Sequence, residues 1–160
     1  MRYNNIFSIL FVVFAFPLLG FTQEPDTPAV YNFEQLEQAF TKEDKPAVIF
    51  LHTNWCRYCK GMSEGTFGDS DLIKLINKDF YYVPFDAESK ETIIFRNVQF
   101  GYESTGVNTG IHQLAKELLS HSEDKSYPVL LIINKDLEIL YQYSGFLDQK
   151  EVTDILNNLI

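Results

Sequence analysis

The segment WCRYCK at residues 55–60 decides how this chain is organised, because it holds both of the chain's cysteines, Cys56 and Cys59. An apolar run at residues 47–51 precedes it, and a short helical stretch is expected to follow it. Two residues between cysteines on the first turn of a helix bring the sulfurs close enough to form an exchangeable disulfide. The N-terminus of a helix also favours a thiolate at Cys56. The pattern therefore predicts a redox-active pair.

Length and composition indicate one folded domain without a nucleic-acid surface. The chain has 160 residues, of which 46% are hydrophobic and 15% are aromatic, which is enough for a packed core. Its formal net charge is −9, and its Lys and Arg residues do not cluster, so no basic surface for nucleic acid is expected. Two cysteines are too few for a disulfide scaffold, and a bridge that closes so short a loop adds little stability.

Residues 1–22 are typical of a secretory signal peptide. Arg2 is their only charged residue, residues 6–16 are apolar except for Ser8, and small residues precede a cleavage point before Gln23. We therefore expect a bacterial protein that is periplasmic or secreted and has no stable membrane insertion after cleavage. The alternative is an uncleaved anchor, although the apolar stretch is shorter than the ~20 residues of a spanning helix.

The remaining residues divide into an extended lead-in over residues 23–31 and one domain over residues 32–160. Helices are predicted at residues 32–42, 70–77, 110–120 and 148–159, and strands at residues 46–52, 80–85, 128–134 and 138–143. The order of the first four elements implies that strands 46–52 and 80–85 are parallel. The last two strands are close enough in sequence to form an antiparallel hairpin.

Local signals refine three places in this outline. Asn32 with Gln35, and Asp148 with Glu151, have the spacing of capping boxes at helix starts. Residues 92–100 predict a hairpin that turns at Arg96-Asn97. The aromatic side chains of this region are expected to cover the core locally, and the alternative is a groove for a partner. The aromatic residues are Phe95, Phe100 and Tyr102.

Taken in order, these features resemble the thioredoxin superfamily over roughly residues 30–160. The resemblance rests on a strand followed by WCRYCK, on Tyr127-Pro128 at the start of a later strand, and on Gly145-Phe146-Leu147 before the last helix. The chain is similar to secreted bacterial thioredoxin-like proteins and to the C-terminal thioredoxin domain of the thiol transporter DsbD. The resemblance implies an α/β fold, with a central mixed β-sheet flanked by helices. It also implies an inserted segment, at about residues 88–108, before the helix that precedes a cis-proline.

The resemblance also implies roles for individual residues. Cys56 corresponds to the nucleophile that attacks a substrate disulfide, and Cys59 to the thiol that resolves the mixed disulfide. Trp55 corresponds to an indole that shields the pair. The bond between Tyr127 and Pro128 is expected to be cis and to face the sulfurs, with the Tyr127 backbone free to bind an extended substrate.

Two positions depart from the thioredoxin pattern. Many thioredoxins carry a buried Asp six residues before the nucleophile, where this chain has Phe50. Another group must then accept the proton of Cys59, and His52 and Glu64 are the candidates by proximity in sequence, although His52 is otherwise an ordinary strand histidine. The residues between the cysteines are Arg57-Tyr58 instead of Gly-Pro. A cation at Arg57 favours the Cys56 thiolate and makes the couple more oxidising.

The predicted function is exchange of disulfides with protein substrates outside the cytoplasm, in the reducing direction. No cofactor is required, and electrons come from another dithiol protein in the membrane or periplasm. One alternative is a disulfide oxidase or isomerase, and another is a binding module that holds a partner without turnover. The cysteines are alternatively inert or ligands of a metal, although zinc sites usually take four ligands. The histidines available for such a site are His52, His112 and His121, of which the last two are expected on a helix surface.

Overall fold

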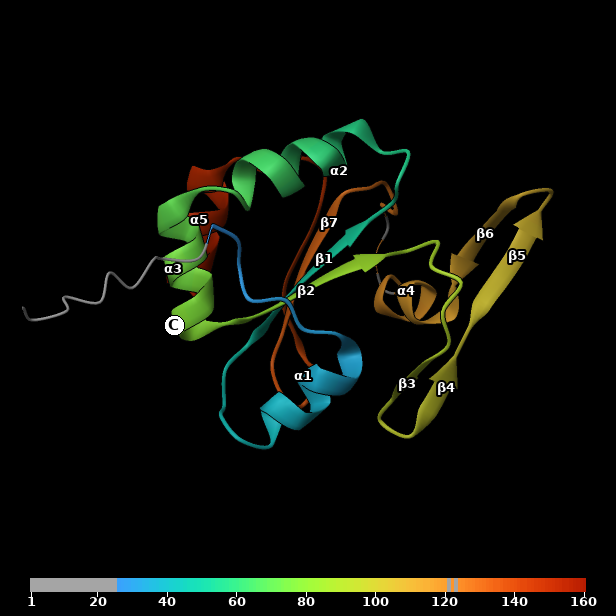
Figure 1. Cartoon of the computed structure of the whole chain (residues 1–160), viewed down its shortest axis with the longest axis horizontal. Coiled ribbons are helices and arrows are strands. Elements are labelled where there is room, and N and C mark those ends of the chain that lie inside the picture. The colour runs from blue at the N-terminus through green and yellow to red at the C-terminus, as the bar shows by residue number, and fades with distance from the viewer. Residues whose placement is uncertain (1–25, 121, 123) are drawn as a thin grey trace, which may run out of the picture.

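A mixed four-stranded sheet forms the centre of the molecule (Figure 1). Its strand order is β2-β1-β7-β8, where β1 is Ala47–His52, β2 is Tyr81–Asp86, β7 is Val129–Ile133 and β8 is Ile139–Ser144. Strands β1 and β2 are parallel, as predicted, whereas β7 runs antiparallel to both β1 and β8. The predicted mixed sheet and the predicted hairpin of the last two strands are therefore confirmed.

The computed structural model describes residues 26–120, 122 and 124–160. The predicted signal peptide at residues 1–22 and the candidate ligand His121 lie outside these residues. No helix in the described part of the chain is both long enough and apolar enough to cross a membrane.

Helices cover both faces of the sheet. Figure 1 shows α1 and α4 on one side of it and α2, α3 and α5 on the other. Their bounds are Phe33–Phe40 for α1, Arg57–Gly61 for α2, Ser70–Asp79 for α3, Gln113–Leu118 for α4 and Gln149–Asn157 for α5, and a π-helical turn, η1, spans Met62–Thr66. Both predicted capping boxes are present, at the starts of α1 and α5.

The alternation of side chains along β1 explains the two layers. Ile49 and Leu51 belong to the hydrophobic core beneath α1 and α4, whereas Val48 and Phe50 belong to the core beneath α2, α3 and α5. Successive residues of a strand point to opposite faces, so a continuous apolar run is buried on both sides. The second core includes Cys56 and Cys59, which places the cysteine pair against this face of the sheet.

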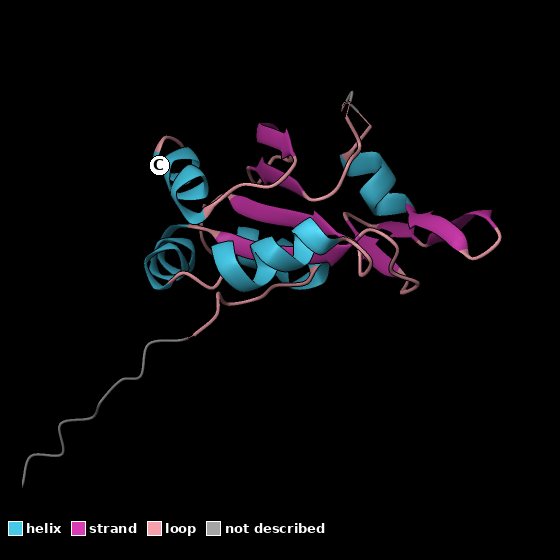
Figure 2. Cartoon of the chain, turned by 90° about the horizontal axis from the view of Figure 1, so that it is seen from above, coloured by secondary structure: helices cyan, strands magenta, loops and turns pink. Residues whose placement is uncertain are grey.

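Two hairpins stand between β2 and α4. The first, β3 (Ile93–Phe95) with β4 (Val98–Phe100), is the predicted hairpin, and its two turn residues both have positive φ. Phe95 packs against Phe33 of α1 with ring centroids 5.3 Å apart, so this hairpin covers the core, as expected. The second, β5 (Tyr102–Gly106) with β6 (Thr109–His112), extends away from the rest of the molecule (Figure 2).

The second hairpin corrects the predicted helix at residues 110–120. That helix begins only at Gln113, because residues 109–112 pair with β5. Gly110 packs closely on Tyr102, since a Cβ there would be 2.3 Å from the Tyr102 ring. His112 is fully buried, so its predicted place on a helix surface is wrong. Its Nδ1 caps α4 by accepting a hydrogen bond from the Leu114 N–H at 3.1 Å.

Candidate active site

Cys56 and Cys59 form a disulfide at the start of α2, with their Cα atoms 5.2 Å apart. Cys56 is the N-cap residue of the helix, and its Sγ accepts a hydrogen bond from the Cys59 N–H at 3.1 Å. Thr53 accepts a hydrogen bond from the Cys56 N–H at 3.2 Å, which ties the pair to the end of β1. The exposed fractions are 7% for Cys56 and 2% for Cys59, so Cys56 lies nearer to the surface.

The helix that carries the pair continues directly into η1. The sequence predicted a short helical stretch here, and it passes into a π-helical turn that the Phe67 N–H closes on the Met62 carbonyl at 2.9 Å. Leu147, just before α5, anchors this turn from outside. Its carbonyl accepts a hydrogen bond from Thr66 Oγ1 at 2.7 Å, and its N–H donates to Met62 Sδ at 3.4 Å.

Three exposed aromatic side chains lie near the disulfide, because Trp55 precedes Cys56, Tyr58 lies between the cysteines, and Phe146 packs against Tyr58. The exposed fractions are 70% for Trp55, 69% for Tyr58 and 45% for Phe146. The rings of Tyr58 and Phe146 are in contact, with centroids 6.4 Å apart. Monomeric proteins rarely leave large aromatic residues grouped at the surface, and such groups mark binding sites. We call these three residues the aromatic rim.

Polar residues at the ends of β1 and β2 hold the loop that precedes Cys56. Asp86 accepts a hydrogen bond from Asn54 Nδ2 at 2.8 Å and another from the Glu88 N–H at 3.0 Å. Glu88 in turn accepts a hydrogen bond from Trp55 Nε1 at 3.0 Å, which fixes the indole on this side of the site. Sequence reasoning missed Asn54, Asp86 and Glu88. The signal was present, because the carboxyl ends of two parallel strands meet at one edge of a sheet.

The peptide bond between Tyr127 and Pro128 is cis. Tyr127 packs against both hydrophobic cores, including the core that contains the cysteines. Burial raises the pKa of its hydroxyl, and the nearby carboxylates of Glu88 and Asp86 raise it further. The Pro128 carbonyl accepts a hydrogen bond from the Gly145 N–H at 2.8 Å, which joins this strand to the segment that carries Phe146. Tyr127 therefore contacts the core that contains the cysteines, and Pro128 is joined to the segment that carries Phe146.

A cavity of about 300 Å³ opens beside the disulfide. Both cysteines line it, and so do the two predicted proton acceptors, His52 and Glu64. Burial lowers the pKa of His52, and the Asp86 carboxylate opposes this effect. The hydroxyl of Thr53, which also lines the cavity, is buried and has no hydrogen-bond partner among the described residues.

Comparison with known proteins identifies the family. A family model for the thioredoxin-like domain matches residues 33–160. The chain belongs to the thioredoxin-like family. The predicted resemblance to the thioredoxin superfamily is therefore confirmed.

Relatives of this thioredoxin-like protein carry names from disulfide chemistry. A segment of 65 residues, 40% of this chain, is 34% identical to the thiol:disulfide interchange protein DsbD of Campylobacter jejuni, and this match spans only 12% of that protein's length. The structure of an oxidoreductase named DsbH is similar over 99% of this chain and 94% of its own, with a TM-score of 0.61 and 14% identity. The C-terminal domain of DsbD from Neisseria meningitidis is similar over 81% of this chain and 98% of its own, with a TM-score of 0.51 and 15% identity. At these identities the two structures show a shared fold alone.

In this thioredoxin-like chain an aromatic side chain, Phe50, lies on the strand that leads to the cysteines. The Phe50 ring lies in the core beneath the cysteines, stacked on His52 with centroids 5.5 Å apart. It offers no group that can take up a proton, whereas the neighbouring His52 does. Arg57 is exposed on the first turn of α2. Among the residues that the structure describes, no three His, Cys, Asp or Glu side chains are grouped closely enough to hold a metal ion.

Proposed function

We propose that this protein is a thiol–disulfide oxidoreductase that reduces disulfides in other proteins outside the cytoplasm. The observation that carries the proposal is the Cys56–Cys59 disulfide at the start of α2, set within the aromatic rim of a thioredoxin-like chain. A disulfide that closes so short a loop adds little stability, and a helix N-terminus favours the thiolate. Both facts favour a redox role for the pair over a structural one.

In the reduced protein, the Cys56 thiolate attacks one sulfur of a substrate disulfide. A bond forms between Cys56 and that sulfur, the substrate S–S bond breaks, and the other substrate sulfur leaves as a thiolate that takes up a proton. Cys59 then attacks Cys56, which releases the second substrate thiol and restores the Cys56–Cys59 disulfide. Two electrons pass from the protein dithiol to the substrate.

The surroundings of the disulfide support a protein substrate over a small thiol. Trp55, Tyr58 and Phe146 together offer an aromatic surface larger than a small thiol would cover, and aromatic residues are enriched at protein interfaces. The segment at Tyr127 and Pro128 is proposed to bind an extended stretch of the substrate, as the family resemblance implies.

The proposed location and the proposed class of electron donor rest on the sequence pattern. We infer that residues 1–22 direct export and are then removed, so that the mature protein works in the periplasm or in the medium. Export places the dithiol in oxidising surroundings, so a second dithiol protein in the membrane or periplasm must reduce it again. The name of the matching relative, a thiol:disulfide interchange protein, supports such a partner.

The test is the reduction potential of the pair, measured on residues 23–160 in glutathione buffers. Trp55 is the only tryptophan and lies next to the pair, so its fluorescence is expected to report the redox state. A potential near about −270 mV supports the reductase, and one nearer about −120 mV overturns the direction in favour of an oxidant. If no reversible two-electron transition occurs, the enzymatic function is overturned and a non-catalytic binding module is favoured.

Mutation provides the second part of the test. Cys56→Ser is expected to abolish reduction of a protein disulfide, because the attacking sulfur is gone. Cys59→Ser is expected to accumulate mixed disulfides with substrates, visible on non-reducing gels. Partner binding that survives in the double variant, with no exchange in the parent, would instead identify a binding module.

A further inference from the structure

The sulfur of Cys59 poses a problem of proton transfer. Cys59 is 2% exposed, yet it must lose a proton before it can attack Cys56. A buried thiol holds its proton more tightly than an exposed one, because burial disfavours the thiolate. A base within reach of the sulfur would make this deprotonation easier. Side chains that line the cavity beside the disulfide are the ones that could act as this base.

Three ionisable side chains other than the cysteines line this cavity, namely His52, Lys60 and Glu64. Lys60 and Glu64 face each other across the helix surface at 3.7 Å, and the exposed fractions of their side chains are 73% and 70%. Both side chains are mostly exposed and pair with each other, whereas the sulfur of Cys59 is buried. His52 is half-buried and extends from the end of β1, on the face of the sheet that carries the cysteines.

A buried polar group, the hydroxyl of Thr53, also lines this cavity next to His52 in the sequence. Thr53 is 2% exposed, and its hydroxyl has no hydrogen-bond partner among the described residues. A buried hydroxyl without a partner is costly, so such groups usually bind water. A cavity of about 300 Å³ has ample room for water between this hydroxyl, the imidazole and the cysteines.

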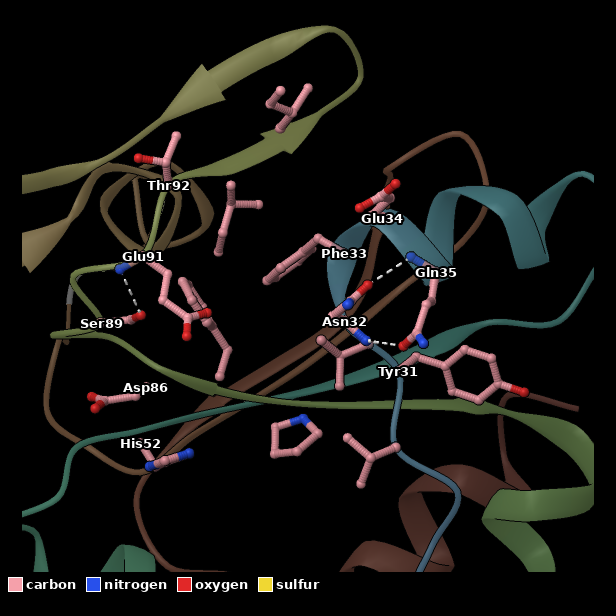
Figure 3. Close-up of a pocket in the computed structure, with 16 residues that line it drawn as sticks. Tyr31, Asn32, Phe33, Glu34, Gln35, His52, Asp86, Ser89, Glu91 and Thr92 are labelled. Atoms are coloured by element: carbon pink, nitrogen blue, oxygen red, sulfur yellow. Dashed lines mark hydrogen bonds between the residues drawn. The ribbon is translucent and has the colours of Figure 1, made fainter.

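A second, larger cavity gives His52 a way to return the proton to solvent. This cavity has a volume of about 620 Å³ and lies along β2 between α1 and β3 (Figure 3). Figure 3 shows His52 and Asp86 together at one end of it. Within the described part of the chain, His52 is the one residue that lines both this cavity and the cavity at the disulfide.

We propose that His52 accepts the proton of Cys59 through water in the smaller cavity and releases it into the larger cavity beside Asp86. This inference rests on the proposed function and supplies its resolving step. The Cys59 S–H bond breaks and its proton passes to neutral His52. The sulfur's electron pair then forms the bond to Cys56 as the bond from Cys56 to the substrate breaks. The departing substrate thiolate takes up a proton from solvent, to which the imidazolium returns its own.

The electrostatics of both cavities fit this role. Burial holds the pKa of His52 below its ordinary value, so the imidazole is neutral at neutral pH and has a lone pair that can accept a proton. Asp86 limits this decrease and stabilises the imidazolium that forms briefly. The other ionisable groups of the larger cavity are Tyr31, Glu34 and Glu91, and those of the smaller cavity are Lys60, Glu64 and the cysteines.

The experiment isolates the resolving step. Reduced protein is mixed rapidly with the aromatic disulfide dithiobis(nitrobenzoate), which forms a mixed disulfide with Cys56, and release of the second coloured thiolate reports attack by Cys59. In the parent, the rate is expected to level off above the pKa of His52. In His52→Gln, it is expected to fall about 100-fold at pH 7 and to keep rising with pH, as for loss of a general base. His112→Gln replaces the other described histidine, which lines neither cavity, and serves as the matched control.

Two results would overturn the inference. One is a His52→Gln variant with the rate and pH profile of the parent, and the other is a loss of rate in Glu64→Gln that His52→Gln does not show. If His52→Gln does not fold, NMR titration of His52 in the parent decides the matter. The pKa of His52 is expected to differ between the oxidised and reduced proteins, and equal values would overturn its link to Cys59.

The failures of the two proposals are distinguishable. Release of the coloured thiolate measures the chemistry of the cysteines whether or not the protein reduces other proteins. A His52-dependent release without reduction of a protein disulfide overturns the proposed function and supports the role of His52. If the protein reduces a protein disulfide but release of the coloured thiolate does not depend on His52, the proposed function is supported and the role of His52 is overturned.

Discussion

The central sheet and the protruding hairpin β5–β6 differ in nearly every physical respect. All residues of β7 are buried, and so are the first five of β1, whereas β5 has no buried residue. Strands β1 and β2 carry the loops of the site, and β7 follows directly on Pro128. The comparison teaches that this fold keeps the candidate site on a buried sheet and places the second hairpin outside the core.

The two regions meet at Ala87, which follows β2. Its N–H donates to the His52 carbonyl at 2.8 Å, and its carbonyl accepts from the His112 N–H at 2.7 Å. Ala87 is fully buried, so this junction is part of the core. The hairpin is therefore joined to the site by backbone hydrogen bonds at its base, while its tip at Val107 is 91% exposed.

The largest effect is expected from a pair of substitutions that separates the chemistry of the cysteines from the protruding hairpin β5–β6. Cys56→Ser is expected to remove disulfide exchange completely, since the remaining cysteine, Cys59, is only 2% exposed and cannot reach a substrate disulfide. Val107→Ser at the hairpin tip is expected to leave the exchange rate within about twofold of the parent, as for most surface changes. Reduction of a protein disulfide by both variants measures this. A large loss in Val107→Ser would show that the hairpin belongs to the substrate site.

The loss of stability on substitution is expected to be large in the central sheet and small at an exposed position of a hairpin. Leu131→Ala in β7 removes a fully buried side chain from the core, so the free energy of unfolding is expected to fall by about 2–5 kcal/mol. Ile94→Ala in β3 changes a side chain that is 61% exposed, and a change within about 0.5 kcal/mol is expected. Denaturant unfolding of both variants provides the comparison. Equal losses would mean that the hairpins are as much a part of the core as β7.

A smaller and local effect is expected at Gly110 of β6. A Cβ there would lie 2.3 Å from the Tyr102 ring and 2.5 Å from the Glu103 carbonyl oxygen, so Gly110→Ala is overpacked. We expect a loss of about 1–3 kcal/mol, confined to faster hydrogen exchange in β5 and β6, with disulfide exchange retained. Gly65→Ala is the matched control, because no atom lies within 4 Å of its added Cβ. Loss of exchange activity in Gly110→Ala would contradict the separation of the two regions.

The smallest effect is expected in the pH dependence of stability. The pKa of His52 is lowered in the folded protein by burial, so below its ordinary value of about 6.5 the unfolded chain binds a proton that the folded chain does not. Stability is therefore expected to decrease as the pH falls from about 6.5 towards the folded pKa, and to change no further from this cause below it. His52→Gln is expected to lack this decrease. Unfolding of both proteins at several pH values measures the difference, and parallel curves would contradict it.

Most of the sheet could be predicted from the sequence because its signals are local. The apolar runs at β1 and β7, the capping boxes at Asn32 and Asp148, and the Arg96-Asn97 turn all act over a few residues. The hairpin β5–β6 was missed for the opposite reason. Its strands are mostly polar, and their pairing depends on contacts such as that between Gly110 and Tyr102.

The sequence by itself determined the candidate redox pair, because the spacing of Cys56 and Cys59 and their place after an apolar strand are local properties of the chain. Only the tertiary structure decided which groups surround those atoms. Glu88 meets Trp55 across 33 positions of sequence, and the cavity that joins His52 to the cysteines exists only when β1, α2 and η1 are packed together. The physical reason is that the spacing of Cys56 and Cys59 along the chain is fixed by the order of the residues. The cavity depends instead on how β1, α2 and η1 fold against one another, and the contact between Glu88 and Trp55 depends on packing between segments that are distant in the chain.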